Sequence, residues 1–156
     1  MAKRILNQSI EALLNSQVIL YPTDTVWGLG CDATSIDAVA KIFKLKNRVE
    51  SKSLVVLVSS IKMLCSYVHK VPQKAIDIIT TTKKPTTIIY NNPKGLAANA
   101  IASDNTIAIR IPSHDYCLEL INKFGKPIIS TSANISGEST PKSFSEISLP
   151  ILEGVD

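Results

Sequence analysis

Histidine, cysteine and long apolar runs are all scarce in this sequence. Its 156 residues include 2 histidines and 3 cysteines. Cys31, Cys65 and Cys117 are odd in number and widely spaced, which favours free thiols over a disulfide framework, and no zinc-ligand spacing is present. The longest strongly apolar run, residues 54–58, is far shorter than the roughly 20 residues that cross a bilayer, and no secretory signal follows the N-terminus. We therefore expect a cytoplasmic protein without a membrane span.

Aromatic and charged residues are also few, at 5% and 19%, whereas hydrophobic residues reach 45%. This composition excludes intrinsic disorder as the main state, because there is enough apolar surface to form a core. A chain of 156 residues suits one domain. The net charge of +4 favours an anionic partner without identifying it.

Hydrophobic periodicity predicts a mixture of helices and strands. The expected helices cover residues 9–15, 35–45, 60–67, 72–81 and 114–124, and the expected strands cover 18–21, 54–58, 86–90, 106–111 and 127–130. We expect a loop over 23–34, helix caps at Ser35 and Ser113, and a capping box of Ser143 with Glu146 at one more short helix. Strict strand–helix–strand alternation is not kept. The predicted fold class is therefore α/β or α+β, with a mixed sheet.

The strand predicted over residues 106–111 alternates between two kinds of side chain. Ile107 and Ile109 fall on one face, and Thr106 and Arg110 fall on the other, because successive side chains of a strand point to opposite sides. A hydroxyl and a guanidinium group are thus expected on the same face of the sheet.

Two polar segments follow predicted strands and are candidates for ligand binding. Residues 21–30 combine hydroxyls with glycines, and the alternative interpretation is a tight turn with Trp27 in the core. Residues 130–137 combine small hydroxyls with one carboxamide, and the alternative is an ordinary Ser/Asn/Gly loop. Neither segment alone identifies a function.

Three cations gather where the second predicted helix ends. Lys46, Arg48 and Lys52 stand just before the strand predicted from residue 54. Lysine ammonium groups and the planar fork of arginine both bind phosphate oxygens. The alternative is a basic helix end that complements the helix dipole, and we assign Lys44 to that structural role. The spacing of Lys46 and Arg48 suits an extended segment that points both side chains into one cleft.

Four strings, YPTDTVWGLG, KLKNR with KSLVVL, TIAIRIPSH and TSANISGESTP, occur in this order over most of the chain. Each string alone is a weak signal, but the ordered set closely resembles the YrdC/Sua5 family of threonylcarbamoyl-AMP synthases. The resemblance implies a twisted mixed β-sheet flanked by helices, with a basic concave face. It also implies a nucleotidyltransferase that condenses L-threonine, bicarbonate and ATP into threonylcarbamoyl-AMP and releases pyrophosphate.

The same resemblance implies cofactors and partners. ATP is a substrate that brings Mg²⁺ with it, and no metal or organic cofactor held by the protein itself is expected. The product serves the formation of threonylcarbamoyladenosine in tRNA, through a downstream threonylcarbamoyl-transferase complex. Either tRNA or double-stranded RNA is a further expected partner, and a membrane is not.

Carried over to the matching positions of this sequence, the resemblance assigns roles to individual residues. The expected catalytic residues are Lys46 and Arg48. The expected ATP-binding residues are Arg48, Lys52, Thr106, Asn134 and Lys142, and the expected threonine-binding residues are Thr25, Arg110 and Ser132. No metal-binding residue is expected. The alternation of the strand independently places Thr106 and Arg110 on one face, which agrees with their assignment to ATP and threonine binding.

The chain departs from the family pattern at several places. Leu57 stands where many relatives have a histidine near threonine, and Lys142 stands where relatives have a threonine. Residues 83–87 replace a Trp-Pro-Gly-Pro-Leu-Thr segment. Relatives also continue past the position of Asp156 with a Pro-Ser-Thr-Ile strand and a basic segment. We therefore expect residues 1–156 to form a single YrdC-like domain that lacks, or does not display, that terminal strand.

Two other functions stay open at this point. The net charge and the departures from the family pattern fit a YrdC-like protein that has lost catalysis. Such a protein would instead bind tRNA or double-stranded RNA, or act as a regulatory protein. A carbamoyl-transfer module fits less well, because this chain lacks the acylphosphatase and zinc-finger segments that accompany such domains in hydrogenase-maturation carbamoyltransferases. The lack of a Ser-His or Cys-His pair does not weigh against the synthase, because adenylate formation depends on positioning and charge neutralisation.

Overall fold

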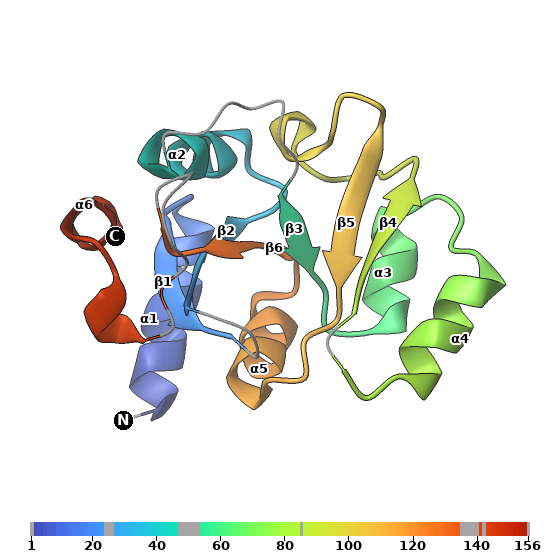
Figure 1. Cartoon of the computed structure of the whole chain (residues 1–156), viewed down its shortest axis with the longest axis horizontal. Coiled ribbons are helices and arrows are strands. Elements are labelled where there is room, and N and C mark those ends of the chain that lie inside the picture. The colour runs from blue at the N-terminus through green and yellow to red at the C-terminus, as the bar shows by residue number, and fades with distance from the viewer. Residues whose placement is uncertain are drawn as a thin grey trace.

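A six-stranded β-sheet with helices on both faces is the centre of the computed structural model, which describes residues 2–23, 27–46, 54–84, 86–134, 141 and 143–155 (Figure 1). The strands are β1 (Ile19–Pro22), β2 (Trp27–Asp32), β3 (Val55–Leu57), β4 (Thr87–Asn91), β5 (Thr106–Arg110) and β6 (Ile128–Ser132). The helices are α1 (Ala2–Leu14), α2 (Ile36–Lys46), α3 (Ile61–Tyr67), α4 (Gln73–Thr81), α5 (Asp115–Phe124) and α6 (Leu149–Gly154), with 3-10 turns η1 (Ala98–Ala100) and η2 (Phe144–Glu146).

The sheet is mixed, as the sequence predicts. Its strand order is β1-β2-β6-β3-β5-β4. Only β3 and β5 are parallel neighbours among the described strands, and the other pairs are antiparallel. β6 comes late in the chain but lies between β2 and β3, so it joins the two halves of the sheet.

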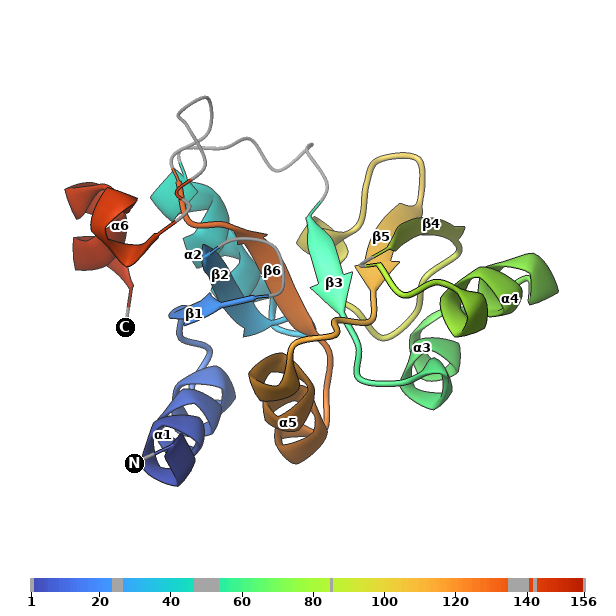
Figure 2. The ribbon, with the colours of Figure 1, turned by 60° about the horizontal axis from the view of Figure 1, so that its bottom comes forward.

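The two faces of the sheet bury different helices. Figure 2 shows α1 and α5 together beneath one face. Their side chains form a cluster with strand residues of that face, which includes Leu13, Tyr21, Leu57, Leu120, Ile121 and Ile128. On the other face, α2, α3 and α4 pack with a larger cluster, which includes Leu29, Ile42, Val56, Leu64, Ala75, Ile107 and Ile129. Ile107 and Ile109 are buried while Thr106 and Arg110 are half-buried, which confirms the alternation predicted for β5.

Among the described strands, β2 alone differs from the sequence prediction, which expects a loop over residues 23–34. Glycine is depleted in strands, yet here Gly28 and Gly30 occupy alternate positions on one face while Leu29 packs into the core on the other. A Cβ atom on Gly30 would lie 2.6 Å from the Tyr21 ring and 3.0 Å from the Ile129 carbonyl oxygen. The glycine therefore permits the close approach of β1, β2 and β6.

Several helix ends also differ from the predictions. α1 begins at Ala2 instead of residue 9. The cap of α5 is His114 instead of Ser113, and it makes no side-chain cap hydrogen bond. The Ser143 side chain makes no cap hydrogen bond either, so the predicted capping box is not formed. The predicted cap at Ser35 is confirmed, because its Oγ accepts a hydrogen bond from the Ala38 N–H at 3.2 Å.

The helices are short. The longest described helix, α1, has 13 residues, and α2 has 11. Within the described ranges, no helix has the length and apolar character that crossing a membrane requires.

Candidate functional site

The face of the sheet beneath which α1 and α5 pack changes from apolar to polar along its strands. At one end Leu57 pairs with Ile128, and both side chains are fully buried. Ser132 and Thr106 lie towards the other end of the same face, and both are half-buried. Ser132 pairs with Gly28 of β2. We call the part formed by Gly28, Ser130, Ser132 and Thr106 the polar end of the sheet.

Three predicted site residues meet at one carbonyl oxygen of this polar end. Lys46, the last residue of α2, is buried, and its Nζ donates a hydrogen bond to the Ser132 carbonyl oxygen at 2.6 Å. The Asn134 N–H donates to the same oxygen at 2.9 Å. The Lys46 ammonium also lies 3.4 Å from Ser132 Oγ. Folding thus joins Lys46 to a strand 86 positions later in the chain.

A second polar group, around Tyr21, was not singled out from the sequence. Burial raises the pKa of the Tyr21 phenol well above its ordinary value, and a hydrogen bond with Ser130 and the positive charge of Arg110 offset only part of that rise. Tyr21 Oη also donates a weak hydrogen bond to the Ile129 carbonyl oxygen at 3.4 Å. The Arg110 charge is therefore felt at the Tyr21 hydroxyl, across the face from its own strand β5. The signal in the sequence was the position of Tyr21 at the head of the YPTDT string.

We expect the protein to lose stability in alkaline solution because the buried side chains of Cys31 and Tyr21 have raised pKa values. Burial, and secondarily the negative charge of Asp32, raises the pKa of the Cys31 thiol, and burial raises that of Tyr21. From about pH 9 for Cys31 and about pH 10 for Tyr21, the unfolded chain releases protons that the folded chain retains. Near neutral pH these two groups should not make the free energy of unfolding depend on pH. Above these pH values, each group should lower the free energy of unfolding by about 1.4 kcal/mol per pH unit.

Urea unfolding at a series of pH values up to about 11 measures this fall. Tyr21→Phe should make the fall less steep above about pH 10, because the phenol that retains its proton in the folded chain is then absent. An identical slope in Tyr21→Phe and the original protein would show that Tyr21 is not responsible.

The remaining predicted residues have different outcomes. Thr25, Arg48, Lys52 and Lys142 lie outside the described residues, so the basic concave face stays a prediction. Leu57, which replaces a family histidine, pairs with Arg110 across β3 and β5 and is fully buried as a core residue.

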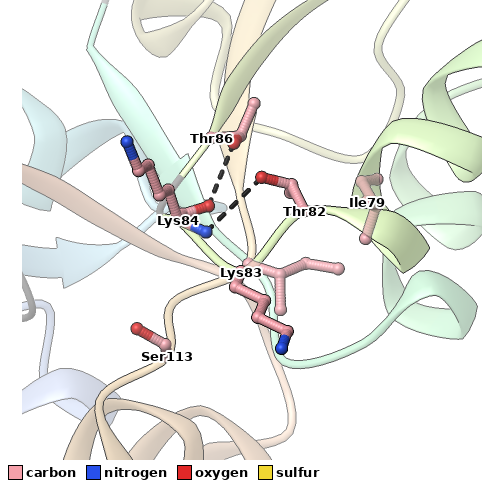
Figure 3. A pocket seen from close by; sticks show the side chains of 7 residues that line it. Ile79, Thr82, Lys83, Lys84, Thr86 and Ser113 are labelled. Carbon is pink, nitrogen blue, oxygen red and sulfur yellow. Dashed lines mark hydrogen bonds between the residues drawn. The ribbon is translucent and has the colours of Figure 1, made fainter.

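Figure 3 shows a separate hollow of about 110 Å³ beside the end of α4, where the chain departs from the family pattern. It is lined by Ile79, Thr82, Lys83, Lys84, Thr86, Ile111 and Ser113. The Lys83 and Lys84 ammonium groups point in opposite directions (Figure 3). They do not converge as a phosphate site requires, so we do not assign phosphate binding to this hollow.

Residues 11–156 match the model of the Sua5/YciO/YrdC family, which is described as telomere recombination. A threonylcarbamoyl-AMP synthase from Pseudoalteromonas translucida is 37% identical over 145 residues, which cover 88% of this chain and 75% of that protein. The synthase of the same name from Hahella chejuensis is 32% identical over 157 residues, which cover 100% of this chain and 85% of that protein.

The crystal structure of P. abyssi Sua5 complexed with L-threonine has the same fold, with a TM-score of 0.90 and 25% sequence identity. The similarity covers 97% of this chain but 45% of that longer chain. The polar end of the sheet thus belongs to a fold that binds threonine in one solved structure.

Proposed function

The chain belongs to the Sua5/YciO/YrdC family, and from that membership we propose that it is a threonylcarbamoyl-AMP synthase acting at the polar end of the sheet. The observation that carries the proposal is that two curated relatives named threonylcarbamoyl-AMP synthase match this chain over 88% and 100% of its length and over 75% and 85% of their own. They favour an enzyme over a protein that only binds RNA.

The proposed reaction has two steps. The amine of threonine attacks the carbon of bicarbonate, forming an N–C bond and a carbamate with loss of water. A carbamate oxygen then attacks the α-phosphorus of ATP, the bond to the bridging oxygen breaks, and pyrophosphate leaves. The second step is a nucleotidyl transfer, in which negative charge accumulates around the α-phosphate and must be neutralised.

Lys46 is the described cation best placed for that task. Its ammonium group is buried at the polar end, 2.6 Å from the Ser132 carbonyl oxygen, and a positive charge acts more strongly where water is excluded. Arg48 and Lys52 would add charge to the same phosphates, with Arg48 as the second catalytic residue.

Mg²⁺ enters the proposal as part of the ATP substrate, held by phosphate oxygens and water. In the described part of the chain, His, Cys, Asp and Glu side chains do not gather in a group of three or more that could hold a metal ion. A cationic group such as the Lys46 ammonium is suited to phosphate oxygens rather than to a metal ion.

The two substrates would occupy neighbouring parts of the same face. Arg110 would hold the threonine carboxylate, because a guanidinium fork matches two carboxylate oxygens. Thr25 and Ser132 would bind the rest of threonine. The nucleotide would contact Thr106, Asn134 and Lys142, and Ser132 would lie where the two substrates meet.

The product would pass to a threonylcarbamoyl-transferase complex that modifies tRNA, which places the proposed work of the protein in the cytoplasm. An assay of the wild-type protein tests the proposal. Incubation with MgATP, threonine and bicarbonate should give threonylcarbamoyl-AMP by mass spectrometry and an equal amount of pyrophosphate, and omission of threonine should abolish both. A folded protein that forms no product but binds RNA with a steep salt dependence would instead favour the RNA-binding function.

A further inference from the structure

Asp104 fixes the direction of the Thr106 hydroxyl. Thr106 Oγ1 donates a hydrogen bond to Asp104 Oδ1 at 2.6 Å. An ionised carboxylate can only accept hydrogen bonds, so the hydroxyl proton points to Asp104. The lone pairs of Thr106 Oγ1 are then left for other groups, and they can accept hydrogen bonds but not donate one.

The turn that carries Asp104 is held in place from both sides. The Ala102 N–H donates to the Thr106 carbonyl oxygen at 2.9 Å, and the Asn105 N–H donates to the Ala102 carbonyl oxygen at 2.9 Å. Asn105 has a left-handed backbone conformation, with φ of 61°, and its Nδ2 donates to Asn92 Oδ1 at 3.1 Å. The Asp104 carboxylate is therefore already in position before a ligand binds.

Thr106 faces the same part of the sheet as Ser132. Ala108 of β5 and Ser130 of β6 both pair with Val55 of β3, so Thr106 and Ser132, two positions further out, lie at the same level on either side of β3. Two inter-strand spacings separate them by about 10 Å. The β6 side holds a buried ammonium group beside Ser132, whereas the side chain that bonds to Thr106 on the β5 side is a carboxylate.

We infer that Asp104 is a specificity-determining residue that, through Thr106, selects the nucleoside end of ATP. The two side chains accept hydrogen bonds from nucleoside donors, namely ribose hydroxyls or the exocyclic amine of adenine. The negative charge of Asp104 repels phosphate, so the triphosphate lies on the β6 side, toward Lys46. This inference rests on the proposed function and adds the orientation of the nucleotide and a residue that sets it.

Equilibrium binding tests the inference in Asp104→Ala. The ligands are ATP and three analogues that each lack one donor: 2′-deoxyATP, 3′-deoxyATP and purine riboside triphosphate. In the wild-type protein, at least one analogue should bind about 10-fold more weakly than ATP, the effect of one hydrogen bond to a charged group. In Asp104→Ala, ATP should weaken to the level of that analogue while the analogue itself changes little. The analogue affected distinguishes a ribose hydroxyl from the amine.

Asp77→Ala is the matched control, because it removes an exposed carboxylate on α4 that bonds to Gln73. The Asp77→Ala variant should discriminate between ATP and the analogues as strongly as the wild type does. Asp104→Leu, which is close in size to aspartate but has no hydrogen-bond acceptor, should lose discrimination between ATP and the analogue as Asp104→Ala does, and it serves if the alanine variant does not fold.

Two results would overturn the inference. The first is that the Asp104 variants discriminate between ATP and the analogues as strongly as the wild type does. The second is that the Asp104 variants bind ATP, every analogue and threonine more weakly by the same factor. Equal affinity of the wild type for all four nucleotides would overturn it as well. Product formation by the wild type is measured separately, so its absence counts against the proposed function while the binding result still decides the role of Asp104.

Discussion

Replacing Lys46 with methionine is expected to lower kcat for threonylcarbamoyl-AMP formation by at least about 100-fold, the usual cost of removing one group that stabilises transition-state charge. The Lys46 ammonium is buried at the polar end of the sheet, where water does not screen it. Methionine fills similar space without a charge, so the variant separates charge from packing. Measurement of kcat and KM for ATP and threonine, with pyrophosphate release as the readout, checks the expectation.

The same variant should fold. Removal of the Lys46 ammonium does not leave the Ser132 carbonyl oxygen without a donor, because the Asn134 N–H also bonds to it. We expect the free energy of unfolding to change by less than about 2 kcal/mol. Lys44→Met, at an exposed lysine one half-turn earlier on α2, removes the same charge and should retain near wild-type kcat. Activity of Lys46→Met within about threefold of wild type would remove Lys46 from the proposed chemistry.

Replacing Arg110 with lysine is expected to raise KM for threonine by about 10- to 100-fold, with little change in the affinity for ATP. Lysine keeps the positive charge but loses the planar fork that binds both oxygens of a carboxylate. The loss should therefore appear in threonine binding. Threonine titrations at saturating ATP, followed by ATP titrations at saturating threonine, separate the two effects.

Arg4→Lys is the control for this substitution, since Arg4 is exposed on α1. It should leave both substrates unaffected. If Arg110→Lys instead raised KM for ATP and left threonine unchanged, the assignment of Arg110 to the threonine carboxylate would be wrong.

Local patterns in the sequence predict the strands whose two faces differ. β5 alternates between isoleucines and polar residues, so the shared face of Thr106 and Arg110 follows from a period of two. β2 also has that period, but glycine fills one face, and glycine is normally read as a turn. The signal that would have revealed the strand is the apolar set Trp27, Leu29 and Cys31 at alternate positions.

Contacts between distant segments were beyond the reach of local patterns. Lys46 was expected to point into a cleft from an extended segment, whereas it is the last residue of helix α2, and nothing near it in sequence indicates its hydrogen bond to Ser132. Asp104 was overlooked because a single carboxylate in a turn has an ordinary structural role. Its importance emerges from the hydrogen bond to Thr106, together with the pairing of β3 with both β5 and β6.

The position of β6 also bears on how the protein is made. β6 bonds to β2 and β3, yet it is the last of the described strands in chain order. Until residues 128–132 leave the ribosome, the β1–β2 hairpin and the β3–β5–β4 unit are two separate sheets with open edges, which are templates for incorrect pairing. Closure then joins Gly28 to Ser132, about 100 residues apart, and such long-range pairing is slow. The nascent chain thus depends on β6 to protect the open edges of β2 and β3 from aggregation.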